Sequence, residues 1–322
     1  MPATSETVAN HEGSMLVWVP IPPVAAALDG VDGITVEVVD PDAIDAEGGE
    51  LPASAAQVEF YVPPLFPRPP AIAALAAMPN LRVVQTLTAG IDLLLPHLPP
   101  GAVLCNARGM HDVSTAEWVV TVMLASTRKI PFFMGESIAG RWTPAFANSL
   151  AGQTVLIIGH GSIGQAVERR LAGFEVDIVR VARTARDGVH PVSELPELLP
   201  RADVVVLLAP VTPATAGLVD AAFLASMKDG ALLVNGARGT LVRTDDLVTE
   251  LASGRLFAAL DVTDPEPLPS AHPLWGLPNA LITPHAAATT WRSATAVLGF
   301  LREQVQRQIE SDPLLNVITG EY

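Results

Sequence analysis

Short apolar runs alternate with helix-like segments along most of the chain. In the first third, the pattern predicts a helix at residues 71–78 and strands at 15–19, 34–39, 58–62, 81–87 and 103–106. Further along, it predicts strands at 154–158, 177–181, 204–208, 231–235, 257–261 and 280–283, and a helix at 245–252 opened by Thr244. Strands that alternate with helices are typical of parallel sheets covered on both faces. The pattern therefore predicts an α/β protein with two doubly wound parallel-sheet domains.

Two positions along the chain are expected to separate these domains. The stretch Ser114–Glu117 (Ser-Thr-Ala-Glu) reads as a capping box, which predicts a helix from Glu117 to about Thr127 that is apolar almost all round. Such a helix has to be covered, either between domains or at a subunit interface. A last helix is predicted from about 289–292 to about Ser311, and we expect it to return to the first domain. The predicted domains are residues 1–108 with 291–322, and residues 109–290; residues 1–14 are expected to form a mobile tail.

A glycine-rich turn joins the strand at 154–158 to a helical pattern. Gly159, Gly161 and Gly164 form the spacing G-x-G-x-x-G. Between a strand and a helix, the first glycine permits the tight turn, the second lets a pyrophosphate approach the backbone, and the third lets the helix pack on the strand. The helix N-terminus adds free N–H groups for the phosphates. We predict that this turn binds a dinucleotide; a purely structural turn is the alternative.

The end of the next strand indicates which dinucleotide is preferred. An NAD site has Asp or Glu there to hold the ribose 2′-hydroxyl, but this strand runs into Arg183, Thr184 and Arg186. A guanidinium pairs well with a phosphate because its planar fork donates two parallel hydrogen bonds. The sequence therefore predicts NADP(H) in preference to NAD(H). The alternative is that both arginines are merely solvated turn residues.

Composition narrows the classes of partner and location. The chain has 322 residues, of which 49% are hydrophobic and 16% are charged, and a formal net charge of −15. That charge argues against nucleic acid as a partner, whereas a local pair of arginines can still bind a phosphate. The single cysteine, Cys105, cannot form an intrachain disulfide and is expected to pack as a small hydrophobe. With no apolar run long enough to span a bilayer and no basic leader, we expect no membrane partner and a reducing, cytoplasmic location.

Three ionisable side chains each follow a predicted strand of the second domain. Arg238 follows the strand at 231–235, Glu266 the strand at 257–261, and His285 the strand at 280–283. Ligands of open α/β sheets bind at the carboxyl ends of the strands, so these three residues are candidates for catalysis. Taken singly, each has a structural alternative: a surface loop residue, a solvated turn residue and a capping side chain.

Several ordered motifs now make a family resemblance specific. The patterns are N-x-x-R-G at Asn235–Gly239, A-L-D-V followed by E-P at Ala259–Pro267, T-P-H at Thr283–His285, a loop at Thr88–Asp92, and Asn106 with Gly109. Together with the glycine turn, they resemble the D-2-hydroxyacid dehydrogenase family, and within it the glyoxylate/hydroxypyruvate reductase group. The resemblance implies a Rossmann dinucleotide-binding domain inserted into a discontinuous, flavodoxin-like substrate-binding domain.

The resemblance also implies an activity and a role for each residue. The enzyme would transfer hydride from NADPH to the carbonyl of a small 2-keto acid, forming a D-2-hydroxy acid. His285 would donate the proton, Glu266 would orient the imidazole, and Arg238 would bind the substrate carboxylate and polarise the carbonyl. Backbone N–H groups of Ala89 and Gly90 would also bind that carboxylate. The residues expected to contact the cofactor are Gly159, Gly161, Ser162, Ile163, Gly164, Arg183, Thr184, Arg186, Ala209, Pro210, Thr215, Gly236, Ala237, Asp261 (at the nicotinamide carboxamide), His285 and Ala287.

Other functions and features remain open at this point. One alternative is an NAD(P)-dependent dehydrogenase of another 2-hydroxy acid or of phosphite. A different class is a dinucleotide-sensing scaffold, similar to the carboxyl-terminal-binding corepressors. We expect a homodimer through the apolar helix after Ser114, and no metal. Trp118 occupies a position where the resembling family often has histidine, and we expect it to affect packing more than chemistry.

Overall fold

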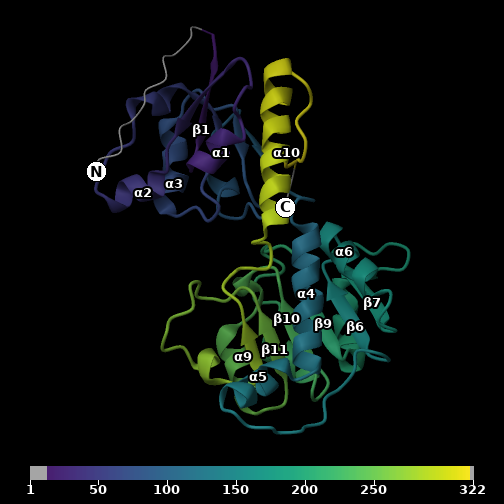
Figure 1. Cartoon of the computed structure of the whole chain (residues 1–322). Coiled ribbons are helices and arrows are strands. Elements are labelled where there is room, and N and C mark those ends of the chain that lie inside the picture. Colours follow the sequence, from purple (N-terminus) through teal and green to yellow (C-terminus); the bar gives the residue numbers. More distant parts are fainter. Residues whose placement is uncertain (1–12, 320–322) are drawn as a thin grey trace. The chain divides into compact units, whose positions relative to one another are not determined.

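The computed structural model describes residues 13–319, so the predicted tail at 1–14 lies almost wholly outside the described residues. The chain divides into two compact units. The first contains the described residues up to His111 and those from Ala294 onward, and the second contains Asp112–Ser293. Both units are α/β structures around a parallel sheet (Figure 1).

The first unit is built on a parallel sheet whose described strands have the order β2-β1-β3-β4-β5. The strands are β1 (Met15–Val19), β2 (Ile34–Val38), β3 (Val58–Tyr61), β4 (Val83–Gln85) and β5 (Val103–Cys105). The helices are α1 (Pro22–Ala26), α2 (Pro41–Ala46), α3 (Pro69–Ala73) and most of α10 (Trp291–Glu310), with 3₁₀ turns at Ala53–Gln57, Ala74–Ala77 and Leu95–His97. This strand order is that of flavodoxin-like folds, as the resemblance implied.

Local sequence explains where the helices of this unit begin. The predicted helix at 71–78 is displaced: α3 starts at Pro69 and gives way to a 3₁₀ turn at Ala74. Proline is favoured in the first helical turn because its missing N–H has no helical partner there.

Cys105 is fully buried, and burial raises the pKa of its thiol to about 11, so the prediction that it packs as a hydrophobe is confirmed.

The second unit is a larger parallel sheet, whose described strands have the order β12-β11-β10-β9-β6-β7-β8. The strands are β6 (Thr154–Ile158), β7 (Asp177–Ala182), β8 (His190–Pro191), β9 (Val204–Leu207), β10 (Leu232–Asn235), β11 (Phe257–Leu260) and β12 (Ala280–Ile282). The helices are α4 (Asp112–Thr127), α5 (Ile130–Ile138), α6 (Ser162–Leu171), α7 (Leu195–Leu198), α8 (Ala221–Ser226) and α9 (Thr244–Ala252), with 3₁₀ turns at Val192–Glu194, Leu199–Arg201, Gly239–Leu241 and Pro273–Gly276. The order reverses between β6 and β9, which is the topological switch point of a Rossmann fold.

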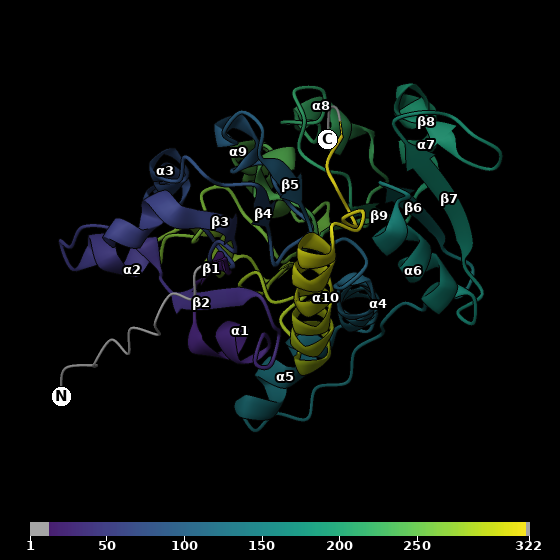
Figure 2. The ribbon, with the colours of Figure 1, turned by 90° about the horizontal axis from the view of Figure 1, so that it is seen from above.

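Helices cover both faces of this sheet because alternate strand residues are apolar. Val155 and Ile157 of β6 pack with α4 and α6, whereas Leu156 and Ile158 pack on the opposite face with α8 and α9. Figure 2 shows α4 and α6 side by side, and the two helices are in contact. None of the described helices is both long and apolar enough to cross a membrane.

Two predicted helix starts in this unit are wrong. The helix expected from Glu117 begins at Asp112, so Ser114 lies inside α4 and is not part of a capping box. Its hydroxyl instead contacts the hydroxyls of Thr290 and Ser293 at 2.6 and 2.8 Å. Thr244 is the first residue of α9 and not its cap, because its hydroxyl donates to the carbonyl oxygen of Asp264.

Candidate active site

The glycine turn after β6 has the shape required for a phosphate to approach the backbone. Gly159 has φ +103°, and a Cβ there would lie 2.4 Å from the backbone nitrogen of Ala209. A Cβ on Gly164 would lie 2.5 Å from the carbonyl oxygen of Gly159, so α6 packs directly on the turn. A Cβ on Gly161 would meet nothing within 4 Å, so this glycine faces open space at the start of α6. The turn therefore fits a pyrophosphate group.

Three polar side chains joined by hydrogen bonds hold this turn. The ring of His160 is 9% exposed, and its Nε2 lies 2.6 Å from Oε2 of Glu168 in α6. Arg180 of β7 makes two hydrogen bonds to the same carboxylate, one of them at 2.9 Å. The hydrogen bonds from Arg180 are the main reason that the pKa of Glu168 falls to about 2; the neighbouring His160 also lowers it, against the effect of burial. The carboxylate is therefore ionised at every physiological pH.

The predicted NADP arginines lie at the end of β7. Nη2 of Arg186 donates to the carbonyl oxygen of His160 at 2.7 Å and lies 3.5 Å from its Nδ1. Arg183 and Thr184 lie exposed in the bend between β7 and Arg186. No acidic residue stands between Ala182 and Arg186, the segment in which an NAD site has Asp or Glu for the ribose 2′-hydroxyl.

Other residues predicted to contact the cofactor follow the carboxyl ends of β6 and β9. Oγ of Ser162, the first residue of α6, donates to Oδ1 of Asp112 at 3.2 Å, while Ile163 packs into the core shared with α4. Ala209 and Pro210 directly follow the residue after β9, and Oγ1 of Thr215 donates to the carbonyl oxygen of Pro210 at 2.7 Å. These residues are therefore fixed by local hydrogen bonds and packing.

Asn235, the last residue of β10, shapes the loop that carries Arg238. Its side chain is 1% exposed, and it accepts from the backbone N–H of Ala237 at 3.1 Å and donates to the carbonyl oxygen of Arg238 at 2.9 Å. Gly236 and Ala237 occupy the tight turn between them. The N-x-x-R-G pattern thus encodes a loop whose first residue holds the backbone of its arginine.

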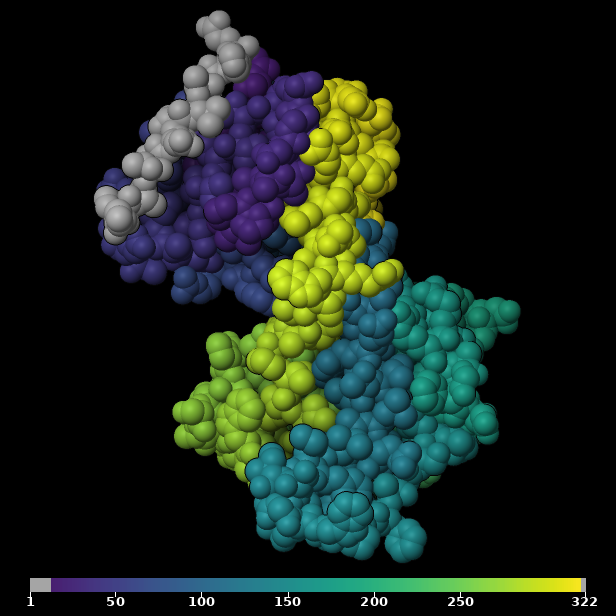
Figure 3. Space-filling model, viewed as in Figure 1, coloured from purple at the N-terminus to yellow at the C-terminus, as the bar shows by residue number. Residues whose placement is uncertain are grey.

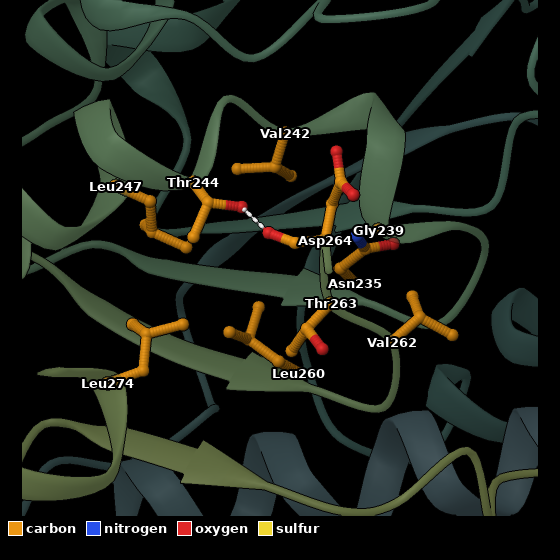
Figure 4. Close-up of a pocket in the computed structure, with 10 residues that line it drawn as sticks. All are labelled: Asn235, Gly239, Val242, Thr244, Leu247, Leu260, Val262, Thr263, Asp264 and Leu274. Atoms are coloured by element: carbon orange, nitrogen blue, oxygen red, sulfur yellow. Dashed lines mark hydrogen bonds between the residues drawn. The ribbon is translucent and has the colours of Figure 1, made fainter. Parts of the chain in front are cut away.

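Gly239 brings this loop against the segment that leads to Glu266. A Cβ on Gly239 would lie 2.0 Å from the carbonyl oxygen of Thr263, so any larger residue would separate the two loops. Thr244 of α9 donates to the carbonyl oxygen of Asp264 at 2.6 Å (Figure 4). A small, mainly apolar pocket lies between these elements, lined by Asn235, Gly239, Val242, Thr244, Leu247, Leu260, Val262, Thr263, Asp264 and Leu274 (Figure 4). The pocket does not include Arg238, Glu266 or His285, and we assign it no role.

His285 and Glu266 form a direct pair at the carboxyl ends of β12 and β11. Nδ1 of His285 lies 2.6 Å from Oε1 of Glu266, and both side chains are partly exposed. Burial alone would raise the pKa of Glu266, but the hydrogen bond and charge of His285, the N–H of Thr263 and the charge of Arg238 together lower it. The structure therefore brings the three candidate residues to the carboxyl edge of the sheet, in the loops that follow three neighbouring strands.

Asp261 holds the backbone that carries His285. The residue is 3% exposed, and its carboxylate accepts from the N–H of Ala286 at 2.8 Å and from the N–H of Ala287 at 2.9 Å. Its carbonyl oxygen accepts from the N–H of His285 at 2.8 Å. Asp261 therefore holds three consecutive N–H groups of the His285 loop, as Asn235 holds the Arg238 loop.

The loop with Ala89 and Gly90 belongs to the first unit, after β4. Nδ2 of Asn106 donates to the carbonyl oxygen of Ala89 at 2.8 Å, and Oγ1 of Thr88 donates to that of Gly90 at 2.9 Å. Asn316, near the C-terminus, donates in turn to the carbonyl oxygens of Asn106 and Arg108. The loop is thus fixed within its own unit.

Sequence reasoning missed two residues that hold the cofactor turn. His160 occupies a variable position of the glycine motif, and Glu168 lies in α6, the helix that follows the turn, so no spacing rule connects them. The available signal was an imidazole side chain between the first two glycines of the motif. Among the described residues, no group of His, Cys, Asp or Glu side chains could hold a metal ion.

These features define a protein with a Rossmann dinucleotide-binding domain. Arg238, Glu266 and His285 lie together at the carboxyl ends of its strands. The D-isomer specific 2-hydroxyacid dehydrogenase NAD binding domain profile matches residues 120–287. A human glyoxylate reductase/hydroxypyruvate reductase is 36% identical over 264 residues, which cover 74% of this chain and 77% of that protein. A D-3-phosphoglycerate dehydrogenase from Archaeoglobus fulgidus is 32% identical over 253 residues, covering 75% of this chain and 48% of that protein.

A solved structure gives the same result over almost the whole chain. The NADPH-dependent glyoxylate/hydroxypyruvate reductase of Sinorhizobium meliloti, in complex with NADP and sulfate, superposes with a TM-score of 0.78 at 28% identity. The match covers 95% of this chain and 98% of that one. The chain belongs to the D-isomer specific 2-hydroxyacid dehydrogenase family, which confirms the resemblance seen in the sequence. It is therefore an NAD(P)-dependent oxidoreductase with a nicotinamide-dinucleotide-binding Rossmann domain.

Proposed function

We propose that this protein reduces a small 2-keto acid of the glyoxylate or hydroxypyruvate type with NADPH, forming a D-2-hydroxy acid. The observation that carries the proposal is the 2.6 Å pair of His285 and Glu266, whose carboxylate also feels the charge of Arg238. An acid–base residue, the carboxylate that orients it and a permanent cation then lie at one edge of the sheet. Reduction of a carbonyl group next to a carboxylate requires these three groups.

Each residue of this group has a distinct task in the proposed reaction. The bound nicotinamide would supply the hydride. Nδ1 of His285 is engaged by Glu266, so its Nε2 is the nitrogen that would give a proton to the carbonyl oxygen. The carboxylate of Glu266 fixes the orientation of the imidazole. Arg238 would bind the substrate carboxylate, because its guanidinium keeps its charge and a planar geometry. In the reverse direction, His285 would act as the base.

The turn at 159–164 and the end of β7 would hold the cofactor. Gly161 leaves open space for the pyrophosphate, and the N-terminus of α6 faces it. Arg186 is tied to the carbonyl oxygen of His160, which places a guanidinium beside the same turn. We therefore propose that Arg186, with Arg183 and Thr184, binds the 2′-phosphate and gives a preference for NADPH. The Sinorhizobium meliloti relative, which its description names NADPH-dependent, supports this choice.

The substrate class rests on the relatives. Proteins described as glyoxylate reductase/hydroxypyruvate reductase support a two- or three-carbon 2-keto acid. The D-3-phosphoglycerate dehydrogenase relative supports another 2-hydroxy acid as the second candidate. The backbone N–H groups of Ala89 and Gly90 are proposed to bind the substrate carboxylate from the first unit.

The proposal is tested by following the loss of NADPH absorbance with glyoxylate, hydroxypyruvate and pyruvate in turn, and the reverse reaction with D-3-phosphoglycerate and phosphite. We expect the highest kcat/KM with glyoxylate or hydroxypyruvate, and a value at least about 10²-fold lower with the His285→Ala variant. Turnover of only phosphoglycerate or phosphite would replace the substrate class. Tight NADPH binding with no turnover of any compound would favour a dinucleotide-sensing scaffold.

We further propose that the protein is a homodimer through α5 and the segment that follows it. Ile138, Trp142 and Phe146 are 84%, 98% and 100% exposed, which is unusual for large apolar side chains on a monomer. The segment lies on the surface of its unit (blue to teal in Figure 3). Its charges, Glu136 and Arg141, pair with each other, so two copies of a strongly acidic chain could meet there without repulsion. The dimer contact expected through α4, the apolar helix that contains Ser114, also remains a prediction.

A further inference from the structure

Two side chains outside the proposed catalytic group form a hydrogen-bonded chain to Asp261. Nε1 of Trp118 donates to Oγ1 of Thr283 at 3.0 Å, and Oγ1 of Thr283 donates to Oδ1 of Asp261 at 2.6 Å. Trp118 belongs to α4, and Thr283 follows β12, two residues before His285. The chain therefore links a helix on the face of the sheet to the loop that carries His285.

The direction of these hydrogen bonds is fixed by chemistry. An indole nitrogen can only donate, and a threonine hydroxyl has one proton and two lone pairs. Because Trp118 occupies a lone pair of Thr283, the single proton of that hydroxyl points to Asp261. The carboxylate of Asp261, which is 3% exposed, then receives three hydrogen bonds: from Thr283 and from the N–H groups of Ala286 and Ala287. Burying a carboxylate is costly unless hydrogen bonds of this kind satisfy its oxygens.

The loop that Asp261 holds has an unfavourable backbone conformation at the proposed catalytic residue. His285 has φ +51°, in the left-handed region that residues other than glycine seldom adopt. Such a conformation persists only where the surrounding structure enforces it. The N–H groups of His285, Ala286 and Ala287 are all bonded to Asp261, so the position of this one aspartate determines the loop.

The ring of Trp118 also contacts the other catalytic loop. A Cβ added to Gly236 would lie 3.2 Å from Cζ3 of Trp118, so the indole packs against the turn between Asn235 and Arg238. One side chain thus touches the Arg238 loop with its ring and reaches the His285 loop through its N–H group. A residue confined to core packing would not need the second contact.

We propose that Trp118 and Thr283 are positioning residues for catalysis, which fix Asp261 and through it the conformation of the His285 loop. This inference rests on the role proposed above for His285, and it extends the packing role that the sequence suggested for Trp118. Neither residue touches the reacting atoms. Their effect should therefore fall on kcat and leave the binding of the 2-keto acid largely unchanged.

The test compares four variants with two matched controls. Thr283→Val removes the hydroxyl with little change of shape, and Trp118→Phe removes the indole N–H together with one of the two fused rings. Thr283→Ser keeps the hydroxyl, and a double variant combines Thr283→Val with Trp118→Phe. The controls remove similar donors elsewhere. Trp275→Phe deletes an indole that donates to the carbonyl oxygen of Pro269, and Thr249→Val deletes a hydroxyl that donates to that of Asp245.

Two measurements are made on each full-length variant. The first is kcat and KM with the best 2-keto acid. The second is hydrogen exchange of the peptide that spans residues 283–289, which contains the N–H groups of Ala286 and Ala287. This measurement does not depend on enzymatic activity.

Thr283→Val is expected to lower kcat about 10-fold at nearly constant KM, since a small displacement of an acid–base group is costly. Trp118→Phe is expected to lower kcat about 3-fold, because Thr283 keeps its hydroxyl but loses the donor that orients it. Both variants should speed exchange in the 283–289 peptide. Thr283→Ser should behave as the wild type, and the double variant should lose little more than Thr283→Val.

Unchanged kcat and unchanged exchange in Thr283→Val would overturn the inference. A change in KM with no change in kcat would also overturn it, as would a Thr283→Ser variant whose kcat and exchange differ from those of the wild type. If Thr283→Val does not fold, Trp118→Phe and its 283–289 exchange decide in the same way. If the wild type reduces no 2-keto acid, the proposed function fails, while the exchange data still support or overturn the positioning of the loop.

Discussion

Nη2 of Arg186 donates to the carbonyl oxygen of His160 at 2.7 Å, which joins the end of β7 to the glycine turn. His160 in turn contacts Glu168, which Arg180 holds from β7. The guanidinium proposed to bind the 2′-phosphate is therefore ordered by the turn proposed to bind the pyrophosphate.

Replacing Arg186 should change the choice of cofactor. Arg186→Ala is expected to lower kcat/KM for NADPH at least about 10-fold, because a charge-assisted phosphate contact contributes roughly 1.5–3 kcal/mol. The value for NADH should change much less. Steady-state kinetics with both cofactors give the ratio, and Arg201→Ala, at a distant 3₁₀ turn, is the control. A wild-type ratio of kcat/KM for NADPH over NADH below one would disprove the preference itself.

The glycines of the turn should separate stability from cofactor binding. Gly161→Ala adds a methyl group to open space at φ −87°, so we expect the melting temperature to stay near that of the wild type while NADPH binding weakens. Gly159→Ala places a Cβ 2.4 Å from the backbone of Ala209 at φ +103°, and should cost about 2 kcal/mol or more in the free energy of unfolding. Thermal unfolding with and without NADPH measures both. Equal loss of stability in the two variants would contradict the proposed role of Gly161.

Removing the imidazole should abolish the proton transfer and leave the fold intact. His285→Ala is expected to lower kcat about 10²–10⁴-fold, the range for loss of a general acid. His190→Ala is the matched control, because His190 forms a similar 2.6 Å pair with Glu194 at an exposed site. Near-normal turnover in His285→Ala would remove this residue from the mechanism.

Glu168 should contribute to stability in a pH-dependent way. Its pKa is lowered in the folded state from 4.5 to about 2, so its ion pairs stabilise the protein above pH 4.5, and this stabilisation is lost as the pH falls toward 2. Glu168→Gln should therefore lower the free energy of unfolding by about 1 kcal/mol near neutral pH, given solvent screening. The difference should shrink below pH 4.5. Urea unfolding over this range, with Glu194→Gln as control, would contradict the assignment if the difference were independent of pH.

The exposed apolar segment should control assembly. Phe146→Asp, at a side chain that is 100% exposed, is expected to convert a dimer into a monomer with little effect on thermal unfolding of the unit. Light scattering after size exclusion measures the mass. Phe257→Asp, at an apolar side chain that is 39% exposed on another element, is the control. A wild type that is monomeric at all concentrations would disprove the homodimer.

Several predictions made from the sequence remain predictions. The binding of substrate by Ala89 and Gly90, the carboxamide contact of Asp261 and the cytoplasmic location belong to this group. For Asp261, the structure adds a role that its motif did not suggest, because two N–H groups and one hydroxyl already bond its carboxylate.

The sequence by itself determined the α/β class, most strands, the glycine turn and the three residues that follow β10, β11 and β12. These features depend on the alternation of apolar residues and on turn chemistry among near neighbours, so they can be read along the chain. Helix starts were less certain. Ser114 and Thr244 looked like caps, yet their hydroxyls bond to Thr290 and Asp264, residues far away in the sequence.

Only the tertiary structure decided which side chains support that site. The contacts of His160 with Glu168 and of Trp118 with Thr283 join elements whose separation in sequence carries no periodic signal. They form because packing α4 and α6 on the same sheet buries polar groups, and a buried donor or acceptor must find a partner wherever the fold provides one.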